Sequence, residues 1–221
     1  YEPQDRIEEW NIENVDTLTQ IKNDLKYISR YFERYSYFKV SGRPVVFIYN
    51  ADAFYASTPE QLKKSFDDIR ESLNSEVSVN LFLVGDVAHP NGSLDEEVHS
   101  GITRGFIASL FDGVYTWSGY MKEYAEPEIK WETYKKQGYE KWSRYCKDGN
   151  ILYIPDVVVS YFPAAKWCDK NDIPISRNPQ DFIKRIKNAL PYMDKNYAIL
   201  LLLEFNNFFE GSVLTPTRED D

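Results

Sequence analysis

The sequence predicts an α/β fold in which helices and strands alternate around a mostly parallel sheet. Short apolar runs recur along the chain, and stretches with helical periodicity separate them. The runs are too short for helices and are rich in β-branched and aromatic residues, which is typical of strands. Several are continuously apolar, as expected for strands buried on both faces of a parallel sheet. The five expected strands are Pro44–Tyr49, Val77–Val84, Phe111–Trp117, Ile151–Val159 and Tyr197–Phe205.

The stretches between these runs have the pattern of amphipathic helices. In the first stretch, apolar residues recur at three- and four-residue spacing with charged residues on the other side. The second opens with Ser57 or Thr58 as a cap and Pro59 at the first helical position. The four expected helices are Val15–Tyr37, Thr58–Leu73, Glu128–Tyr145 and Pro179–Leu190.

Alternation of strand and helix at this spacing is typical of βα units, and no linker rich in Gly, Ser or Pro divides the chain. We therefore expect residues 1–221 to form a single catalytic-type domain, a (β/α)8 TIM barrel. Five strands are too few to close an eight-stranded barrel, and the sequence begins "YEPQDRIEEW" without Met. We expect the chain to cover the later βα units, with the N-terminal strands and any export signal lying upstream.

Composition narrows the classes of partner. With 26 basic and 35 acidic residues, the net charge is −9, whereas a nucleic-acid-binding protein needs a basic face. The sequence has no Gly-rich phosphate loop and no apolar run of the length that spans a membrane. Two cysteines and two histidines are too few for a Cys/His metal cluster. We therefore expect no metal, no cofactor, no nucleic acid and no membrane span.

Two features bear on the compartment. Cys146 and Cys168 could form a disulfide, which would favour an oxidising compartment, but their spacing does not define the geometry. Asn91, Gly92 and Ser93 form a glycosylation sequon. These features favour an extracytoplasmic or secretory-pathway location.

Polar and aromatic side chains gather at or just after the expected strand ends, where βα folds place their chemistry. Carboxylates and amides pair with hydroxyl groups, and aromatic rings stack on sugar faces, so the set suits an oligosaccharide or glycan. Ordinary loop capping explains any single residue equally well, and the convergence of the whole set favours function. The expected substrate-binding residues are Glu2, Tyr49, Asp52, Tyr115, Trp117, Asp156 and Tyr161; Glu204, Asn207 and Glu210 follow the last strand.

The segment "EFNNFFEGSVLTP" after the last strand resembles the C-terminal signature of family 99 glycoside hydrolases, the endo-α-mannosidase/endomannanase type. That signature reads Phe-Asn-Glu-Trp-x-Glu-Gly and closes with Glu-Pro. "YEP" at the start, "LKYISRYFERYSYFKVSGRPVVFIYN", "FDGVYTW" and "YIPDVVVSYFPAAKW" resemble further segments of the family in the same order. The resemblance implies the later strands of a TIM barrel and cleavage of α-mannoside-type glycans.

The family's chemistry uses two carboxylates three residues apart, in a mechanism proposed to pass through a 1,2-anhydro sugar. One carboxylate takes the 2-hydroxyl proton and the other protonates the leaving oxygen. The resemblance implies that Glu210 is the acid, and it places Asn207 where the family has its base. An amide cannot take a proton at neutral pH, and Phe208 also replaces the family's Trp.

Three readings therefore stay open. In an active hydrolase the base comes from Glu204, Asp156, Glu2 or the substrate, and the catalytic set is Glu210, Asn207 and Glu204. The alternative is a degenerate domain that binds glycan without cleaving it, or that serves as a structural part of a larger surface protein. A glycan-processing barrel of another specificity is the third reading, since fold does not fix function. In each reading that involves glycan, we expect Glu2, Tyr115, Trp117, Glu204, Asn207 and Glu210 to line one cleft.

Overall fold

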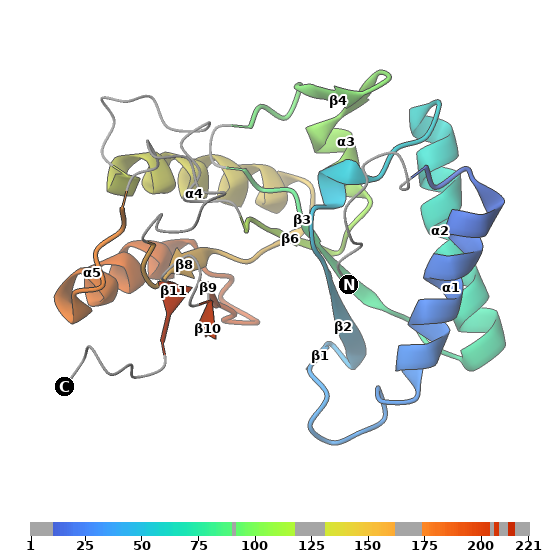
Figure 1. Cartoon of the computed structure of the whole chain (residues 1–221), viewed down its shortest axis with the longest axis horizontal. Coiled ribbons are helices and arrows are strands. Elements are labelled where there is room, and N and C mark those ends of the chain that lie inside the picture. Colours follow the sequence, from blue (N-terminus) through green and yellow to red (C-terminus); the bar gives the residue numbers. More distant parts are fainter. Residues whose placement is uncertain are drawn as a thin grey trace. The chain divides into compact units, whose positions relative to one another are not determined.

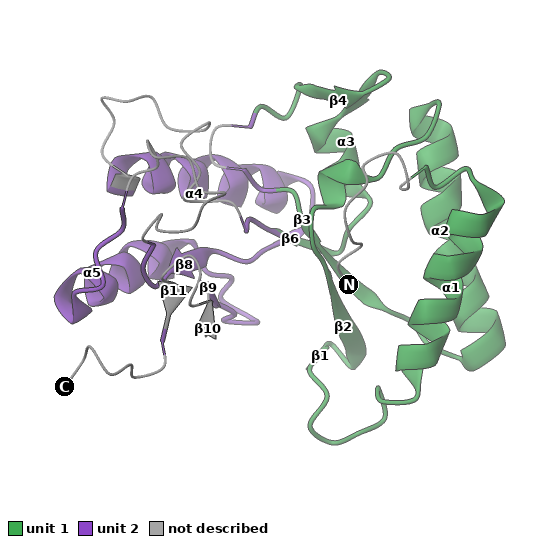
Figure 2. Cartoon of the chain, viewed as in Figure 1, with its two compact units in different colours: residues 1–87, 93–114 green, residues 88–92, 115–221 purple. Residues whose placement is uncertain are grey.

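The computed structural model describes residues 11–89, 92–117, 131–161, 174–203, 206–207 and 212–214. The chain divides into two compact units (Figure 2): residues 1–87 with 93–114, and residues 88–92 with 115–221. Helices and strands alternate in both units (Figure 1), which confirms the α/β class expected from the sequence. Closure into an eight-stranded barrel and organisation as one domain stay predictions. No helix in the described ranges is long and apolar enough to cross a membrane.

The first unit is built on a sheet with the strand order β1-β2-β3-β6. β1 and β2 pair in antiparallel orientation, whereas β2 and β3 are parallel, with Ile48 opposite Gly85. The parallel pairing confirms the orientation expected for the first two apolar runs. The elements are α1 (Val15–Ser29), β1 (Lys39–Val40), β2 (Arg43–Ile48), η2 (Ala51–Ala53), α2 (Pro59–Val77), β3 (Phe82–Asp86), β4 (Glu97–His99), β5 (Ile102–Thr103), α3 (Arg104–Ser109) and β6 (Gly113–Tyr115).

Local signals set where the first two helices begin. The side chains of Asn14 and Thr58 accept backbone N–H groups of the first turns of α1 and α2, which satisfies donors that a helix start leaves open. The apolar face of α1 buries Ile21 and Leu25, and α1 lies alongside α2 (Figure 1). The amphipathic pattern read from the sequence is thus the packing face of α1.

Asp112 joins the strands of the first unit to helix α2. Its carboxylate lies 2.8 Å from Arg43 Nη2 at the start of β2 and 3.0 Å from Arg70 Nη2 on α2. It also accepts the Leu83 N–H at 2.9 Å, while the Asp112 N–H donates to the Leu83 carbonyl at 2.9 Å. These contacts hold the residue before β6 against β3, so β6 enters the sheet at that edge.

In the second unit, β8 and β9 form a parallel pair with Val158 opposite Leu203, as expected for the last two apolar runs. β6 ends in this unit at Tyr115, and β7 is next to it in the strand order. Trp142 of α4 is fully buried and donates its indole N–H to the His89 carbonyl at 2.8 Å. The elements are α4 (Trp131–Asp148), β7 (Leu152–Tyr153), β8 (Asp156–Val158), α5 (Pro179–Ala189), η4 (Leu190–Tyr192), β9 (Leu201–Leu203), β10 (Asn206–Asn207) and β11 (Ser212–Val213).

Several expected boundaries are wrong, for local reasons. The run from Val77 to Val84 is not one strand, because α2 continues to Val77 and Ser78 ends it in the left-handed conformation, with φ 55°. The run from Ile151 to Val159 is two strands, since Pro155 lies between them and has no N–H to pair. The first helix ends at Ser29 instead of continuing to residue 37. The hairpins β1–β2, β4–β5 and β10–β11 were not expected.

Cys146 is a buried free thiol on α4. Burial raises the pKa of this thiol to about 12, so it stays protonated at neutral pH. Cys168, with which it could pair, lies outside the described residues.

Candidate functional site

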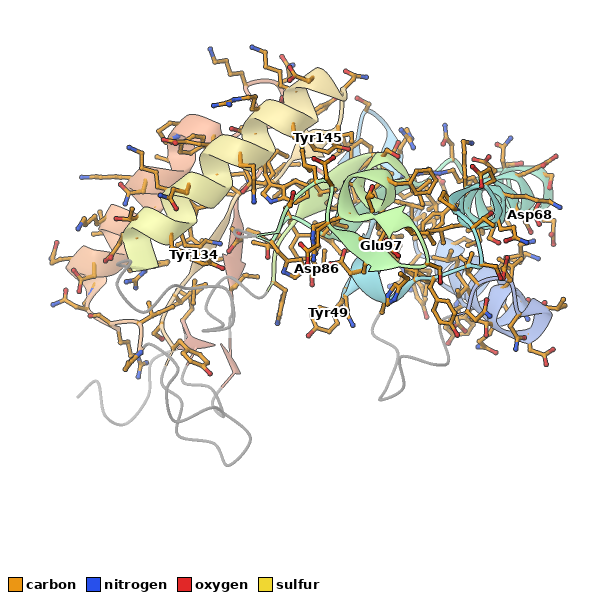
Figure 3. The ribbon with its side chains drawn as sticks, turned by 90° about the horizontal axis from the view of Figure 1, so that it is seen from above. Tyr49, Asp68, Asp86, Glu97, Tyr134 and Tyr145 are labelled. Carbon is orange, nitrogen blue, oxygen red and sulfur yellow. The ribbon has the colours of Figure 1, made fainter. Side chains whose placement is uncertain are left out.

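The carboxyl ends of β2 and β3 lie next to each other, because the two strands run parallel in register. Tyr49 follows β2 directly, and Asp86 is the last residue of β3; both are labelled in Figure 3. Asn50 has the left-handed conformation (φ 50°, ψ 49°), which points the chain into η2. Its N–H donates to Asp86 Oδ2 at 3.2 Å. This edge therefore presents a buried carboxylate, an amide and a half-buried tyrosine in one place.

Asp52, two residues further on, forms an ion pair with Arg104. Arg104 Nη1 donates to Asp52 Oδ2, and Arg104 Nη2 lies 3.3 Å from Glu96 Oε1. The side chain of Arg104 is 7% exposed and that of Asp52 is 13% exposed, whereas Glu96 is 47% exposed. One guanidinium from α3 thus bridges the turn after β2 to the segment before β4.

His99 of β4 makes the second contact to this turn. Its Nε2 lies 2.9 Å from the Asp52 carbonyl oxygen. Because a carbonyl only accepts, Nε2 is the donor nitrogen of this contact. The His99 ring also packs against Tyr55, with ring centroids 5.7 Å apart. The β4–β5 hairpin therefore braces the turn that holds Asp52.

In the second unit, the carboxyl end of β6 carries Tyr115, Thr116 and Trp117. Tyr115 is buried, and its carbonyl accepts the Ala88 N–H at 2.9 Å. Thr116 is 1% exposed, yet its Oγ1 has no hydrogen-bond partner in the part of the chain that the structure describes. Trp117 is half-buried. Sequence reasoning singled out the two aromatic residues and missed Thr116, although it lies between them; only its burial distinguishes it.

Asp156 lies at the opposite, amino end of β8, facing Leu201 at the start of β9. Its side chain is fully buried, and Lys135 Nζ of α4 lies 2.8 Å from Oδ1 and 2.6 Å from Oδ2. The Tyr139 hydroxyl donates to the Asp156 carbonyl at 2.5 Å. Burial raises the pKa of the Asp156 carboxyl above its usual range, and the Lys135 ammonium opposes that shift. Lys135 occupies both carboxylate oxygens, so this pair ties α4 to β8.

Tyr161 follows the carboxyl end of β8 and is buried against Val158 and Ile175. The side chain of Arg185 on α5 donates hydrogen bonds to the backbone at the same end of β8. Its Nε donates to the Val158 carbonyl at 3.0 Å and its Nη2 to the Val159 carbonyl at 2.6 Å. Burial lowers the pKa of this guanidinium from its usual value. Arg185 thereby satisfies the carbonyl groups that β8 leaves open where it ends.

The C-terminal motif begins where β9 ends. Leu203 closes β9 opposite Val158, and the Val159 N–H donates to the Leu203 carbonyl at 2.7 Å. Asn207 lies in β10, where it pairs in antiparallel orientation with Ser212. Glu2, Glu204 and Glu210 lie outside the described residues. The motif therefore directly follows the carboxyl end of a parallel strand, as expected for a site in a βα fold.

The substrate-binding residues expected from the sequence are divided between the two units. In the first unit, Tyr49 and Asp52 lie at or just beyond the carboxyl end of β2, with Asp86 beside them and Arg104 bound to Asp52. In the second, Tyr115 and Trp117 follow β6 and Tyr161 follows β8, whereas Asp156 lies at the other end of β8. Convergence of the set on one cleft stays a prediction. Within the described ranges, no group of three or more His, Cys, Asp or Glu side chains could hold a metal ion.

Comparison with known proteins gives matches in structure only. No protein-family model matches the sequence, and no curated protein matches it. A solved structure described as a glycoside hydrolase-like protein matches 89% of this chain with a TM-score of 0.65 and 16% identity. The GH99 endo-α-mannosidase from Bacteroides thetaiotaomicron matches 90% of the chain at 19% identity, with a TM-score of 0.62, or 0.63 in its complex with Bis-Tris propane.

These matches cover 52–55% of the solved proteins, so the chain spans about half of their length. At this level of identity the likeness concerns the fold. The chain therefore has a glycoside hydrolase-like α/β fold that resembles the fold of GH99 endo-α-mannosidase.

Proposed function

We propose that this chain is the later part of a glycoside hydrolase-like barrel that acts on α-mannoside-type glycans. The observation that carries the proposal is the position of the C-terminal motif in the chain, directly after β9, whose last residue pairs with the last residue of the parallel strand β8. Chemistry in βα barrels gathers at this end of the strands. The likeness in fold to a GH99 endo-α-mannosidase over 90% of the chain supports the same substrate class.

In the proposed reaction, Glu210 protonates the leaving oxygen of the glycosidic bond. Glycoside cleavage needs two groups in different protonation states, and Asn207 supplies no proton acceptor. Lys135 holds both oxygens of Asp156 inside the second unit, which leaves Glu204 and Glu2 as the carboxylates proposed for the base. Polar and aromatic side chains at the strand ends, such as Tyr49 and Trp117, bind the sugar rings.

A second candidate is a domain that binds the same glycans without cleaving them. Asn207 favours it, because an amide stands where the resembling family has its base. Such a domain keeps hydrogen bonds and ring contacts to the sugar and lacks the proton transfer. We propose an extracytoplasmic location for either candidate, on the basis of the sequence features alone.

The test measures cleavage and binding of α-mannoside oligomers by the full chain and by two variants. Glu210→Gln removes the proposed acid, and loss of a positioned general acid typically lowers the rate about 10²–10⁴-fold. We expect this variant to lose cleavage and keep binding. Asn207→Glu restores a carboxylate at the matching position, so we expect it to raise or create cleavage. Glu71→Gln, an exposed position on α2, is the matched control.

The outcomes separate the two candidates. Cleavage that depends on Glu210 supports the hydrolase, and binding without cleavage by the unchanged chain supports the binding domain. If the unchanged chain cleaves well and Asn207→Glu lowers the rate, the base lies elsewhere and the assigned roles are wrong. If no form binds or cleaves a glycan on a broad panel, both candidates fail.

A further inference from the structure

The end of α1 and the turns after it carry a row of tyrosine and arginine side chains, of which Tyr31 is half-buried and the others are exposed. Arg30 Cζ lies 3.6 Å from the ring centroid of Tyr27 and 5.0 Å from that of Tyr31. Arg34 Cζ lies 4.5 Å from the Tyr31 centroid. Tyr27 is 60% exposed and Tyr35 is fully exposed. We call these five residues, Tyr27, Arg30, Tyr31, Arg34 and Tyr35, the Tyr–Arg surface.

The backbone fixes this arrangement. After α1 ends, turns closed by hydrogen bonds between residues i+3 and i follow, with the Arg34 N–H donating to the Tyr31 carbonyl at 3.1 Å and the Tyr37 N–H to the Arg34 carbonyl at 3.0 Å. Such turns place residues i and i+3 on the same side, which stacks Arg34 on Tyr31. Phe32 faces inward and is 1% exposed. Its ring packs edge-on against Tyr37, with centroids 4.8 Å apart. The buried Phe32 ring therefore fixes residues 31–37 to the protein, while the side chains on the other side of the segment face solvent.

The two guanidinium groups have unused hydrogen-bonding capacity. Among the described residues, the side chains of Arg30 and Arg34 contact aromatic rings but make no hydrogen bond or ion pair. A guanidinium stacked on a ring keeps its N–H edges available, and those edges match a carboxylate with two parallel hydrogen bonds. Residues 26–39 carry four basic side chains and one acidic one, in a chain with a net charge of −9. Lys26 is paired with Glu76, which leaves Arg30, Arg34 and Lys39 as the excess positive charge. The surface is a local basic site on an acidic protein.

We propose that the Tyr–Arg surface binds a polysaccharide that carries carboxylate groups, such as a chain of uronic acid residues. The guanidinium groups bind two carboxylates of the chain, and the exposed Tyr35 ring packs against a sugar face. The choice of a sugar polymer over an acidic peptide rests on the proposed function; the anionic character rests on the arginines alone.

An extended anionic surface such as a lipid bilayer fits less well. Acidic side chains lie close to the Tyr–Arg surface in sequence, with Glu33 between the two arginines and Asp24 on α1. Surface charges interact over about 8–10 Å at physiological salt, so a flat anionic surface meets these acids as well as the arginines. A single polymer chain needs to contact only the two guanidinium groups and a ring.

This surface is separate from the candidate site at the strand ends. The Tyr37 hydroxyl donates to the Val45 carbonyl at 3.0 Å, near the start of β2, and the Val45 N–H donates to the Phe38 carbonyl. Asn50 and Asp86 lie beyond the other end of the same strand. Six residues of β2 span about 20 Å. The Tyr–Arg surface therefore lies toward the opposite end of β2 from Asn50 and Asp86.

The test is calorimetric titration of the full chain with an oligogalacturonate and with its fully methyl-esterified, neutral form. We expect the charged oligomer to bind, with an affinity that falls as salt is raised, and the neutral form to bind at least tenfold more weakly. The double variant Arg30→Gln/Arg34→Gln should lower the affinity at least tenfold, and Tyr35→Ala severalfold. Arg144→Gln, which removes an exposed arginine of α4, should leave it unchanged.

Several results would overturn the proposal. They are absence of binding by the unchanged chain, equal binding of the neutral oligomer, or equal losses in the double variant and in Arg144→Gln. Equal or tighter arginine-dependent binding of polyglutamate would identify an acidic peptide as the partner, and the same result with phosphatidylserine vesicles would identify a membrane. Cleavage of α-mannosides should not change in the double variant. Loss of binding to the charged oligomer therefore tests the Tyr–Arg surface, and loss of cleavage tests the proposed function.

Discussion

Asp52 and Asp156 were both expected to bind substrate, and the two units place them differently. Asp52 follows the carboxyl end of β2, where its side chain is 13% exposed and is held by Arg104. Asp156 begins β8, where it is fully buried and both oxygens contact Lys135. One carboxylate belongs to an edge that stays partly open to solvent, and the other is enclosed between a strand and a helix.

The difference shows that strand direction decides the role of a polar residue in a βα fold. Residues after the carboxyl end of a strand face the side where ligands bind, whereas a residue at the amino end has no such opening. A charge that is buried at the amino end, as that of Asp156 is, must be paired inside the protein, because an isolated buried charge is costly. The Lys135–Asp156 pair meets that requirement, and the Arg104–Asp52 pair orders a surface turn.

The largest effect is expected for Lys135→Met, which leaves the Asp156 carboxylate buried without its cation. Removing one partner of a buried ion pair costs about 3–5 kcal/mol. The free energy of unfolding, from urea denaturation followed by tryptophan fluorescence, should fall by this amount. Lys136→Met, on the exposed side of the same helix, should leave it nearly unchanged. Equal effects in both variants would contradict the comparison.

A smaller effect is expected for Arg104→Met, because Asp52 retains some contact with water. Loss of hydrogen bonds to a charged group costs about 1.5–3 kcal/mol. The change should also speed amide hydrogen exchange in the β4–β5 hairpin and in η2, which Arg104 joins through Glu96 and Asp52. Exchange that stays as slow as in the unchanged chain would show that the guanidinium does not hold this turn.

Tyr139→Phe tests the neutral part of the buried cluster. It removes the hydroxyl that donates to the Asp156 carbonyl and keeps the ring. We expect the free energy of unfolding to fall by about 1 kcal/mol. Tyr35→Phe is the matched control, since the Tyr35 side chain is fully exposed. A loss as large as that of Lys135→Met would mean that the hydroxyl contributes as much to stability as the ion pair does.

The titration of Asp156 should make a small contribution to the change of the free energy of unfolding with pH. Burial raises its folded pKa above the ordinary value of 3.8, so between these two values the folded state binds more protons than the unfolded state. The contribution of Asp156 to stability is therefore present below pH 3.8 and is lost as the pH rises through the folded pKa. Asp156→Asn removes this titration, and the free energy of unfolding of the variant should fall less over that window. An unchanged slope would contradict a raised pKa.

Much of the secondary structure could be predicted, because its signals are local. The caps at Asn14, Thr58 and Asn178 act within a few residues of the helix starts, and apolar periodicity marks the buried faces. Boundaries were less certain because they depend on single residues. Ser78 ends α2 only by taking a left-handed conformation, and Pro155 splits a run that looks continuous in the sequence.

The candidate site was predictable only as a set of strand-end residues. The positions of Tyr49 and Trp117 followed from the strand ends, but Thr116 was missed because nothing in its type separates it from a surface threonine. Arg104 carried no signal either, since its partner Asp52 lies 52 residues earlier. The spacing of residues in the sequence does not show which side of α3 packs against the turn after β2.

The alternation of helices and strands, the starts of α1, α2 and α5 and the parallel pairing of β2 with β3 and of β8 with β9 can be read from the amino-acid sequence. These features depend on neighbours within a few residues or on the burial of whole segments. Which carboxylate is enclosed and which remains at a strand edge becomes visible only in the folded chain. Lys135 meets Asp156 across 21 residues of chain, and that meeting depends on how α4 docks on β8. Ion pairs of this kind arise from packing, because desolvation and distance, not residue type, set their strength.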